Sequence, residues 1–139
     1  MKPELLTVAA RPCGSCPYRR DVPSGVWAAS EYDKLPDYDK PTPEQPFAVF
    51  LCHQRDGCMC AGWLACHGHE RGHELLALRL SFSTGEADRA VLGYTTDVPV
   101  FASGAEAAAH GKRGIEQPDP KAKKLVAKLM PLLDDTVRP

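Results

Sequence analysis

The spacing of apolar residues along the chain predicts short helices, and the clearest pattern lies near the C-terminus. There, apolar side chains recur at intervals of three, four, seven and eight residues, with lysines between them: Ala122, Leu125, Val126, Leu129 and Met130. Asp119 can cap a helix at this point, and Pro120 suits its first turn. The pattern predicts a C-terminal amphipathic helix over residues 119–131.

Other helices are indicated by their end signals and their composition. The stretch "SGAEAAAHG" begins with a capping box, Ser103 and Glu106, and meets a stop signal at Gly111. "CAGWLACHG" is expected to be a short helix stopped by Gly68. "HERGHELLALRLSF" favours a helix through its Glu, Leu and Ala content, although its alternating apolar residues also fit a strand. "EADRAVLGY" is expected to form another short helix.

The N-terminal half alternates between short apolar runs and proline-rich segments. Ser24 can cap a short helix over "GVWAASEYDKL". Four prolines then disfavour regular structure between residues 36 and 46. The run "FAVFLC", Phe47 to Cys52, places six apolar residues between a proline and a turn, which predicts a buried strand.

The length and composition of the chain predict a small fold that is rich in loops. The 139 residues suffice for one modest core, and 13 prolines with 11 glycines predict irregular connections. We expect a single domain over residues 1–139, mainly α with a short β element and a loop-rich N-terminal half. It divides into a cysteine-rich metal-binding part at 11–68, a helical part at 73–113 and the C-terminal helix.

Charge and hydropathy narrow the expected partners and compartment. The net charge of −1 gives no support for nucleic-acid binding, and the lysines of the C-terminal helix are typical of a solvated face. No apolar run approaches the roughly 20 residues of a membrane span, and the start lacks the apolar core of a signal peptide. Six cysteines without an export signal indicate a reducing compartment, where disulfides do not persist. We therefore expect a cytoplasmic protein with a protein partner and no membrane contact.

The cysteines fall into two clusters that together suggest a metal site. Cys13 and Cys16 form a CxxC knuckle, whose spacing lets two thiolates turn toward one cation. The segment "CHQRDGCMC" supplies three more thiols, beginning 36 residues after Cys16. Clustered cysteines and histidines of this kind in a reducing compartment are more typical of metal binding than of buried free thiols.

Position along the predicted elements selects four of the six thiols. Cys52 ends the predicted strand, and Cys60 begins a predicted helix, where free N–H groups and the helix dipole favour a thiolate. Cys66 stands six residues further on, about 240° around that helix, so it should point away. The predicted ligands are Cys13, Cys16, Cys52 and Cys60. The side chains that could replace or support them are His53, Cys58, Cys66 and His67.

These segments resemble an uncharacterised family of small cysteine-rich actinobacterial and actinophage proteins, a domain of unknown function. The resemblance is carried by "PCGSCPYRRDVPSGVWAASEYDKL", "FLCHQ", "CAGWLACHG" and "DVPVFASGAEAAAHG", and covers about residues 11–111. The recurring pieces are similar to CxxCP, CH and CAG. On this chain they imply a site at Cys13, Cys16, Pro17, Cys52, His53 and Cys60, and they imply no particular activity.

The chemistry of the ligands gives zinc as the expected cofactor, with an iron–sulfur cluster as the alternative, because four thiolates suit either. A thioredoxin-like dithiol is disfavoured, since only 12 residues precede Cys13 and leave little room for the usual preceding strand. The histidines after the second cluster, His67, His69 and His73, are expected to form a polar loop.

These expectations favour a binding protein over an enzyme. A closed four-thiolate site offers no position for water, and no Ser-His-Asp set, phosphate loop or HExxH motif is present. We therefore expect a metal-stabilised protein that acts by binding a macromolecular partner. A redox or sensor protein with an iron–sulfur cluster is the alternative, and a metalloenzyme that uses His53 is a further one.

Overall fold

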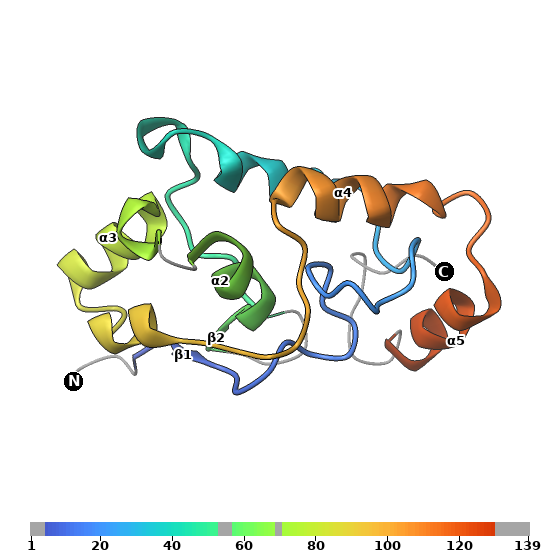
Figure 1. Cartoon of the computed structure of the whole chain (residues 1–139), viewed down its shortest axis with the longest axis horizontal. Coiled ribbons are helices and arrows are strands. Elements are labelled where there is room, and N and C mark those ends of the chain that lie inside the picture. Colours follow the sequence, from blue (N-terminus) through green and yellow to red (C-terminus); the bar gives the residue numbers. More distant parts are fainter. Residues whose placement is uncertain (1–4, 53–56, 69–70, 130–139) are drawn as a thin grey trace.

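Short helices joined by long connections make up most of the molecule. The computed structural model describes residues 5–52, 57–68 and 71–129 (Figure 1). The α-helices are α1 (Ala29–Tyr32), α2 (Ala61–Gly68), α3 (Leu76–Thr84), α4 (Gly104–Arg113) and α5 (Pro120–Leu129). Single 3₁₀ turns lie between them: η1 (Leu35–Asp39), η2 (Thr42–Glu44), η3 (Gly72–Glu74) and η4 (Arg89–Gly93). The predicted class, mainly α with a short β element, is confirmed.

The β element is a two-stranded parallel sheet, and it is not the predicted one. β1 (Thr7–Val8) pairs with β2 (Cys58–Met59), with Thr7 opposite Cys58. The predicted strand over 47–52 is wrong: in that run only a single antiparallel bridge forms, between Leu51 and Met59. Phe47 is 75% exposed and Leu51 50% exposed, so the run is only partly buried.

The segment around Phe50 nevertheless places the second cysteine cluster. The Cys52 amide donates to the Cys58 carbonyl at 2.8 Å, and the Cys60 amide donates to the Phe50 carbonyl at 2.8 Å. Phe50 is buried and fixes the segment against the core. These two hydrogen bonds lay the backbone of Cys52 beside the chain that leads into α2.

Two expectations for the N-terminal half are also corrected. Ser24 does not cap α1, which begins after Ala28 without a side-chain cap. Its hydroxyl instead donates to the Gly111 carbonyl and accepts from the Gly114 amide, which ties this loop to the end of α4. The proline-rich segment is not irregular throughout, because prolines occupy the first turns of η1 and η2, where a missing N–H costs nothing.

Helix α4 runs along η1 and α1 (Figure 1). One half of its predicted capping box is confirmed, since the Ser103 hydroxyl accepts from the Glu106 amide at 3.1 Å, whereas the Glu106 carboxylate accepts from the Ala102 amide instead of that of Ser103. The predicted stop at Gly111 is wrong, and the helix continues to Arg113. Gly111 is required for packing instead, because a Cβ there would lie inside the ring of Tyr32.

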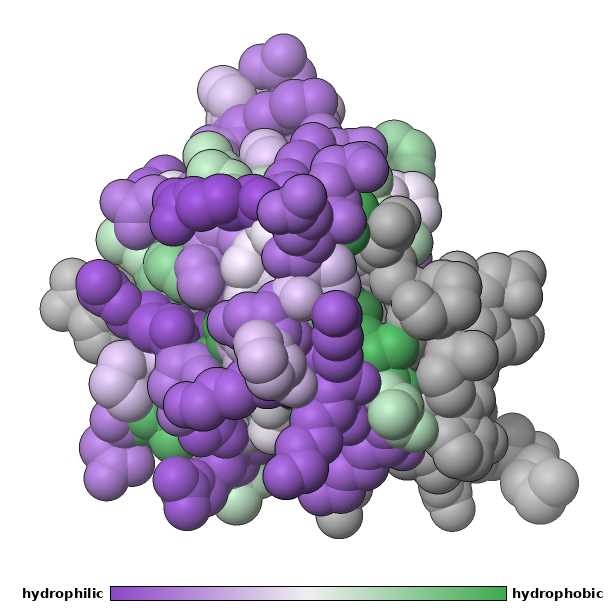
Figure 2. Space-filling model, turned by 90° about the vertical axis from the view of Figure 1, so that its right-hand side faces the viewer, coloured by the Kyte–Doolittle hydropathy of each residue, from purple (hydrophilic) through white to green (hydrophobic). Residues whose placement is uncertain are grey.

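The C-terminal helix α5 forms as predicted. The Asp119 carboxylate accepts from the Ala122 amide at 2.8 Å, as a helix cap does. Ala122, Val126 and Leu129 are buried, whereas the lysines of α5 are exposed. Figure 2 faces the end of the molecule that carries α5 and shows a mostly hydrophilic surface. Met130 lies outside the described residues.

The core contains both tryptophans. Trp27 and Trp63 are fully buried, together with Tyr18, Leu35 and Met59. In the part of the chain that the structure describes, no helix is long and apolar enough to cross a membrane.

Candidate metal centre

The knuckle that carries Cys13 and Cys16 is a tight turn held by the core. The Cys16 amide donates to the Cys13 carbonyl at 3.0 Å, and the Arg19 amide donates to the Cys16 carbonyl at 3.1 Å. The Trp27 indole donates to the Ser15 carbonyl at 2.8 Å. Ser15 and Cys16 are both fully buried, so the core fixes the direction of the Cys16 thiol.

The structure brings Cys16 and Cys60 together from positions 44 residues apart. Their sulfurs lie 3.6 Å from each other, and both cysteines are free thiols. Cys60 directly precedes α2, as predicted. The Trp63 amide in the first turn of this helix points at the Cys60 sulfur, at 3.4 Å.

A glycine permits the close approach of these two segments. Gly62 lies in the first turn of α2 against the knuckle, and a Cβ there would meet the Cys16 sulfur well inside contact distance. The same Cβ would lie 2.9 Å from the Tyr18 Cβ. Glycine at this position therefore lets the backbone of α2 face the thiol directly.

Backbone N–H groups surround the Cys16 sulfur and favour its thiolate. The pKa of Cys16 is lowered, first by the hydrogen bond from Cys60 and then by the amides of Tyr18, Arg19 and Gly62. The pKa of Cys60 is raised by its hydrogen bond to Cys16 and by burial. The arrangement therefore favours a thiolate on Cys16 over one on Cys60.

Cys13 and Cys52 lie near this pair without joining it. The Cys13 sulfur is 3.6 Å from the Ser15 hydroxyl. Burial, helped by the neighbouring charges of Cys16 and, more weakly, Cys52, raises the pKa of Cys13 to about 11. Among the residues that the structure describes, no group of three or more His, Cys, Asp and Glu side chains is arranged to hold a metal ion. His53 lies outside those residues.

The other two thiols are directed elsewhere. The Cys58 sulfur lies 3.6 Å from the Thr7 hydroxyl on β1. Cys66 lines a cavity beside α2, where burial raises its pKa to about 12. Neither thiol makes a contact with Cys16 or Cys60 like the one that joins those two.

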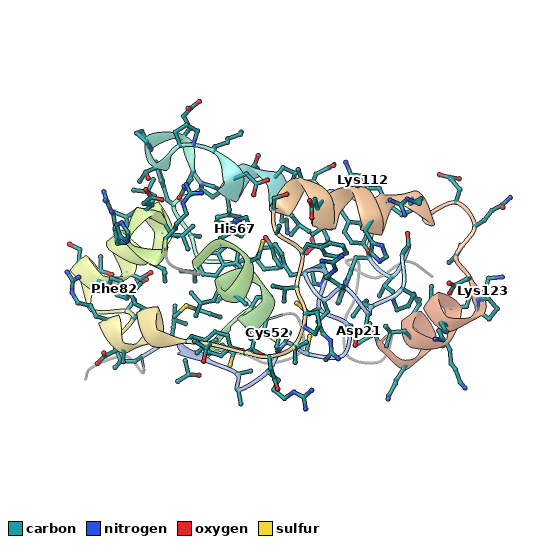
Figure 3. The ribbon with its side chains drawn as sticks, viewed as in Figure 1. Asp21, Cys52, His67, Phe82, Lys112 and Lys123 are labelled. Carbon is teal, nitrogen blue, oxygen red and sulfur yellow. The ribbon has the colours of Figure 1, made fainter. Side chains whose placement is uncertain are left out.

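His67 takes part in a buried polar chain that the sequence does not predict. Its Nε2 lies 3.0 Å from the Tyr18 hydroxyl, and its Nδ1 lies 3.5 Å from the Asp39 carboxylate. Burial lowers the pKa of His67 to about 4, so the ring is neutral, and the Tyr18 hydroxyl donates to it. Figure 3 shows His67 near α4 and Cys52 toward the opposite end of α2.

Comparison with known families gives one informative result. The model described as a family of unknown function (DUF6283) matches residues 8–130. No curated protein and no solved structure matches this chain.

Proposed function

The chain belongs to this family of unknown function, and we propose that it is a metal-stabilised protein that works by binding a macromolecular partner. The proposed cofactor is one zinc ion held by Cys13, Cys16, Cys52 and Cys60. The metal has a structural role, and the compartment is the reducing cytoplasm.

The observation that carries this proposal is the spacing of Cys16 and Cys60. Two thiolates that bind one zinc at about 2.3 Å in a tetrahedron have sulfurs about 3.8 Å apart. The Cys16 and Cys60 sulfurs are 3.6 Å apart without forming a disulfide. The amides that point at both sulfurs supply hydrogen bonds that support ligand thiolates.

The remaining two ligands would come from segments already beside this pair. Cys13 lies one turn before Cys16 in the knuckle; its thiol faces the Ser15 hydroxyl and would have to turn to bind the same ion. Cys52 is held beside β2 by its amide. With all four thiolates bound, the site has no place for water, which favours a structural ion over a catalytic one.

A structural ion would stabilise a fold whose regular elements are short. Its binding energy would count as folding energy, because the unfolded chain offers no preformed site. We expect one zinc per chain by elemental analysis, and a fall of the melting temperature by more than about 10 °C after chelation. An unchanged melting temperature in metal-free protein would contradict the proposal. A visible absorption spectrum with bound iron would favour the iron–sulfur alternative.

The proposed partner is a protein that covers Phe47 and Leu51, the exposed large apolar side chains before Cys52. Phe47 and Leu51 are exposed at the surface there, and exposed apolar clusters commonly mark interaction sites. A photo-crosslinking residue at Phe47 should give a discrete adduct in the cells that make the protein. The same residue at the exposed Ala109 of α4 is the control. Equal labelling from both positions would contradict a partner at this surface.

A further inference from the structure

A cavity of about 630 Å³ lies beside the thiol cluster and is not used by the proposed metal site. It is bounded by η1, the C-terminal half of α2, η3 and residues 100–103. Its volume falls within the range of about 300 to 1,000 Å³ that is usual for small-molecule sites. The cavity is therefore large enough for a compact organic ligand.

One wall of the cavity carries a fixed carboxylate. The two oxygens of Asp39 accept from the Gly104 and Ala105 amides of α4, each at 2.8 Å. His67 lies on the other side of Asp39, at 3.5 Å. The Asp39 side chain keeps 29% of its surface exposed and lines the cavity, so a ligand there can reach it. Because Gly104, Ala105 and His67 already hold this carboxylate in place, it needs no rearrangement to bind a ligand.

The balance of charge in the cavity is negative. Arg71 and Glu74 also line it, but they form an ion pair with each other. His67 is neutral, and its Nε2 accepts the Tyr18 hydroxyl. Among the described residues, no side chain with a full positive charge is paired with Asp39. The negative end of the short helix α2 and the positive N-terminus of α4 both lie at Asp39 and act in opposite directions, so the negative balance rests on the side chains.

The remaining walls are mostly apolar and aromatic, and the polar Gln45 and Ser103 among them are hydrogen-bonded within the protein. Tyr38, Leu75 and Phe101 line the cavity together with the face of α2. The rings of Tyr38 and His67 stand 5.6 Å apart, and Tyr38 uses its hydroxyl to donate to the Ala48 carbonyl. Tyr38 therefore offers the cavity a ring without a free polar group. Phe101 already packs with the Arg20 guanidinium, 5.8 Å from its ring centroid, so it offers a ligand apolar area rather than a free cation-binding face.

We propose that this cavity binds a compact organic cation, an amine or amidine on an apolar or aromatic body, with its positive group on Asp39 and its body against Phe101 and Leu75. The ligand class follows from the fixed carboxylate, the ion-paired arginine and the aromatic walls. The site is separate from the thiol cluster, so it does not depend on the proposed metal function.

Three probes of nearly equal shape test the charge that the cavity prefers. Benzamidine is a cation, benzamide is neutral and benzoate is an anion, and each can be titrated calorimetrically into the protein as purified. We expect benzamidine to bind at least about tenfold more tightly than benzamide, and benzoate to bind most weakly. Absence of benzamidine binding, or tighter binding of benzoate, would overturn the proposal.

Variants then locate the binding. Asp39→Asn removes the charge with little change of shape, and benzamidine affinity should fall about tenfold, to that of benzamide. Asp37→Asn, on the same turn but outside the cavity lining, should leave binding unchanged. If Asp39→Asn fails to fold, Ala102→Trp at the cavity rim should block binding, whereas Ala109→Trp on α4 should not. Benzamidine binding that survives Ala102→Trp would show that the probe binds elsewhere and would overturn the assignment.

Discussion

Gly62 is the residue on which the geometry of the thiol cluster depends most directly. It allows α2 to begin against the knuckle, with its own amide facing the Cys16 sulfur. Any side chain there would have to occupy space already filled by that sulfur and by Tyr18. Because both neighbours are fully buried, neither can move away without disturbing the core.

Gly62→Ala should therefore weaken both the fold and metal binding. Overpacking of this kind costs about 1–3 kcal/mol, and we expect the melting temperature to fall by several degrees and the zinc content to drop. Gly14→Ala in the knuckle is the matched control, because a Cβ at Gly14 meets nothing within 4 Å. Equal melting temperatures for the two variants would contradict this view of Gly62.

Single thiols also differ in their expected importance. Cys58 faces Thr7 and Cys66 faces the cavity, so Cys58→Ser and Cys66→Ser together should leave the metal content unchanged. Cys16→Ser and Cys60→Ser should each remove the metal, because each deletes one member of the close pair. Elemental analysis of the purified variants measures this, and loss of metal from the double variant would show that the ligand set is different.

At the scale of elements, the close packing of α4 on α1 reverses the stability change that helix propensity alone predicts for an alanine at Gly111. Alanine is favoured over glycine inside a helix by about 0.5–1 kcal/mol. At Gly111, however, a Cβ would collide with the ring of Tyr32, which is buried and whose hydroxyl accepts from the Trp27 amide. The hydrogen bond and the surrounding core thus hold the Tyr32 ring in place, so it cannot easily move away from a new methyl group.

Gly111→Ala should accordingly destabilise the protein, by about 1 kcal/mol or more in the free energy of unfolding, despite the better helix former. Ala109→Gly, at an exposed position of α4, should cost only the propensity difference of about 0.5–1 kcal/mol. Urea unfolding of both variants gives the comparison. A stabilised Gly111→Ala protein would mean that α4 and α1 pack less closely than described.

The elements that the sequence predicts well are those with local signals. α5 and α4 begin at residues whose side chains accept from their first-turn amides, Asp119 and Ser103. The failures are tertiary in origin. The run from Phe47 to Cys52 is apolar in sequence, but β2 pairs mainly with β1, and Phe47 is left at the surface. Gly111 looks like a stop signal, but it serves the packing of Tyr32.

In the candidate site, too, the features with local signals could be predicted from the sequence, and the contacts between distant segments could not. The position of Cys60 at the start of α2 and the different direction of Cys66 follow from helix geometry, which the sequence contains. The chain formed by Tyr18, His67 and Asp39 joins three distant segments, and no spacing in the sequence signals it. The proposed roles of Cys13, Cys16, Cys52 and Cys60 in metal binding stay predictions.

At the scale of the whole molecule, His67 links stability to pH. Burial lowers its pKa from 6.5 to about 4 in the folded protein. His67 is therefore protonated near pH 6.5 in the unfolded chain but only near pH 4 in the folded protein. Between these values the unfolded state binds more protons, so the contribution of His67 to stability is present above pH 6.5 and is lost as the pH falls.

The free energy of unfolding should thus decrease between pH 7 and pH 5, with roughly 1 to 2 kcal/mol of the decrease due to His67. His67→Gln removes the titrating group, and its unfolding free energy should change less over the same interval by that amount. Urea titrations of both proteins at the two pH values measure the difference. An identical pH dependence in the two proteins would show that His67 is accessible to protons in the folded state.

The central claim, a closed four-thiolate zinc site, is tested most directly by X-ray absorption at the metal edge of the purified protein. We expect a zinc edge with a single shell of four sulfur neighbours at about 2.3 Å. A shell that contains oxygen or nitrogen, or a protein purified without stoichiometric metal, would contradict the claim that Cys13, Cys16, Cys52 and Cys60 enclose one zinc ion.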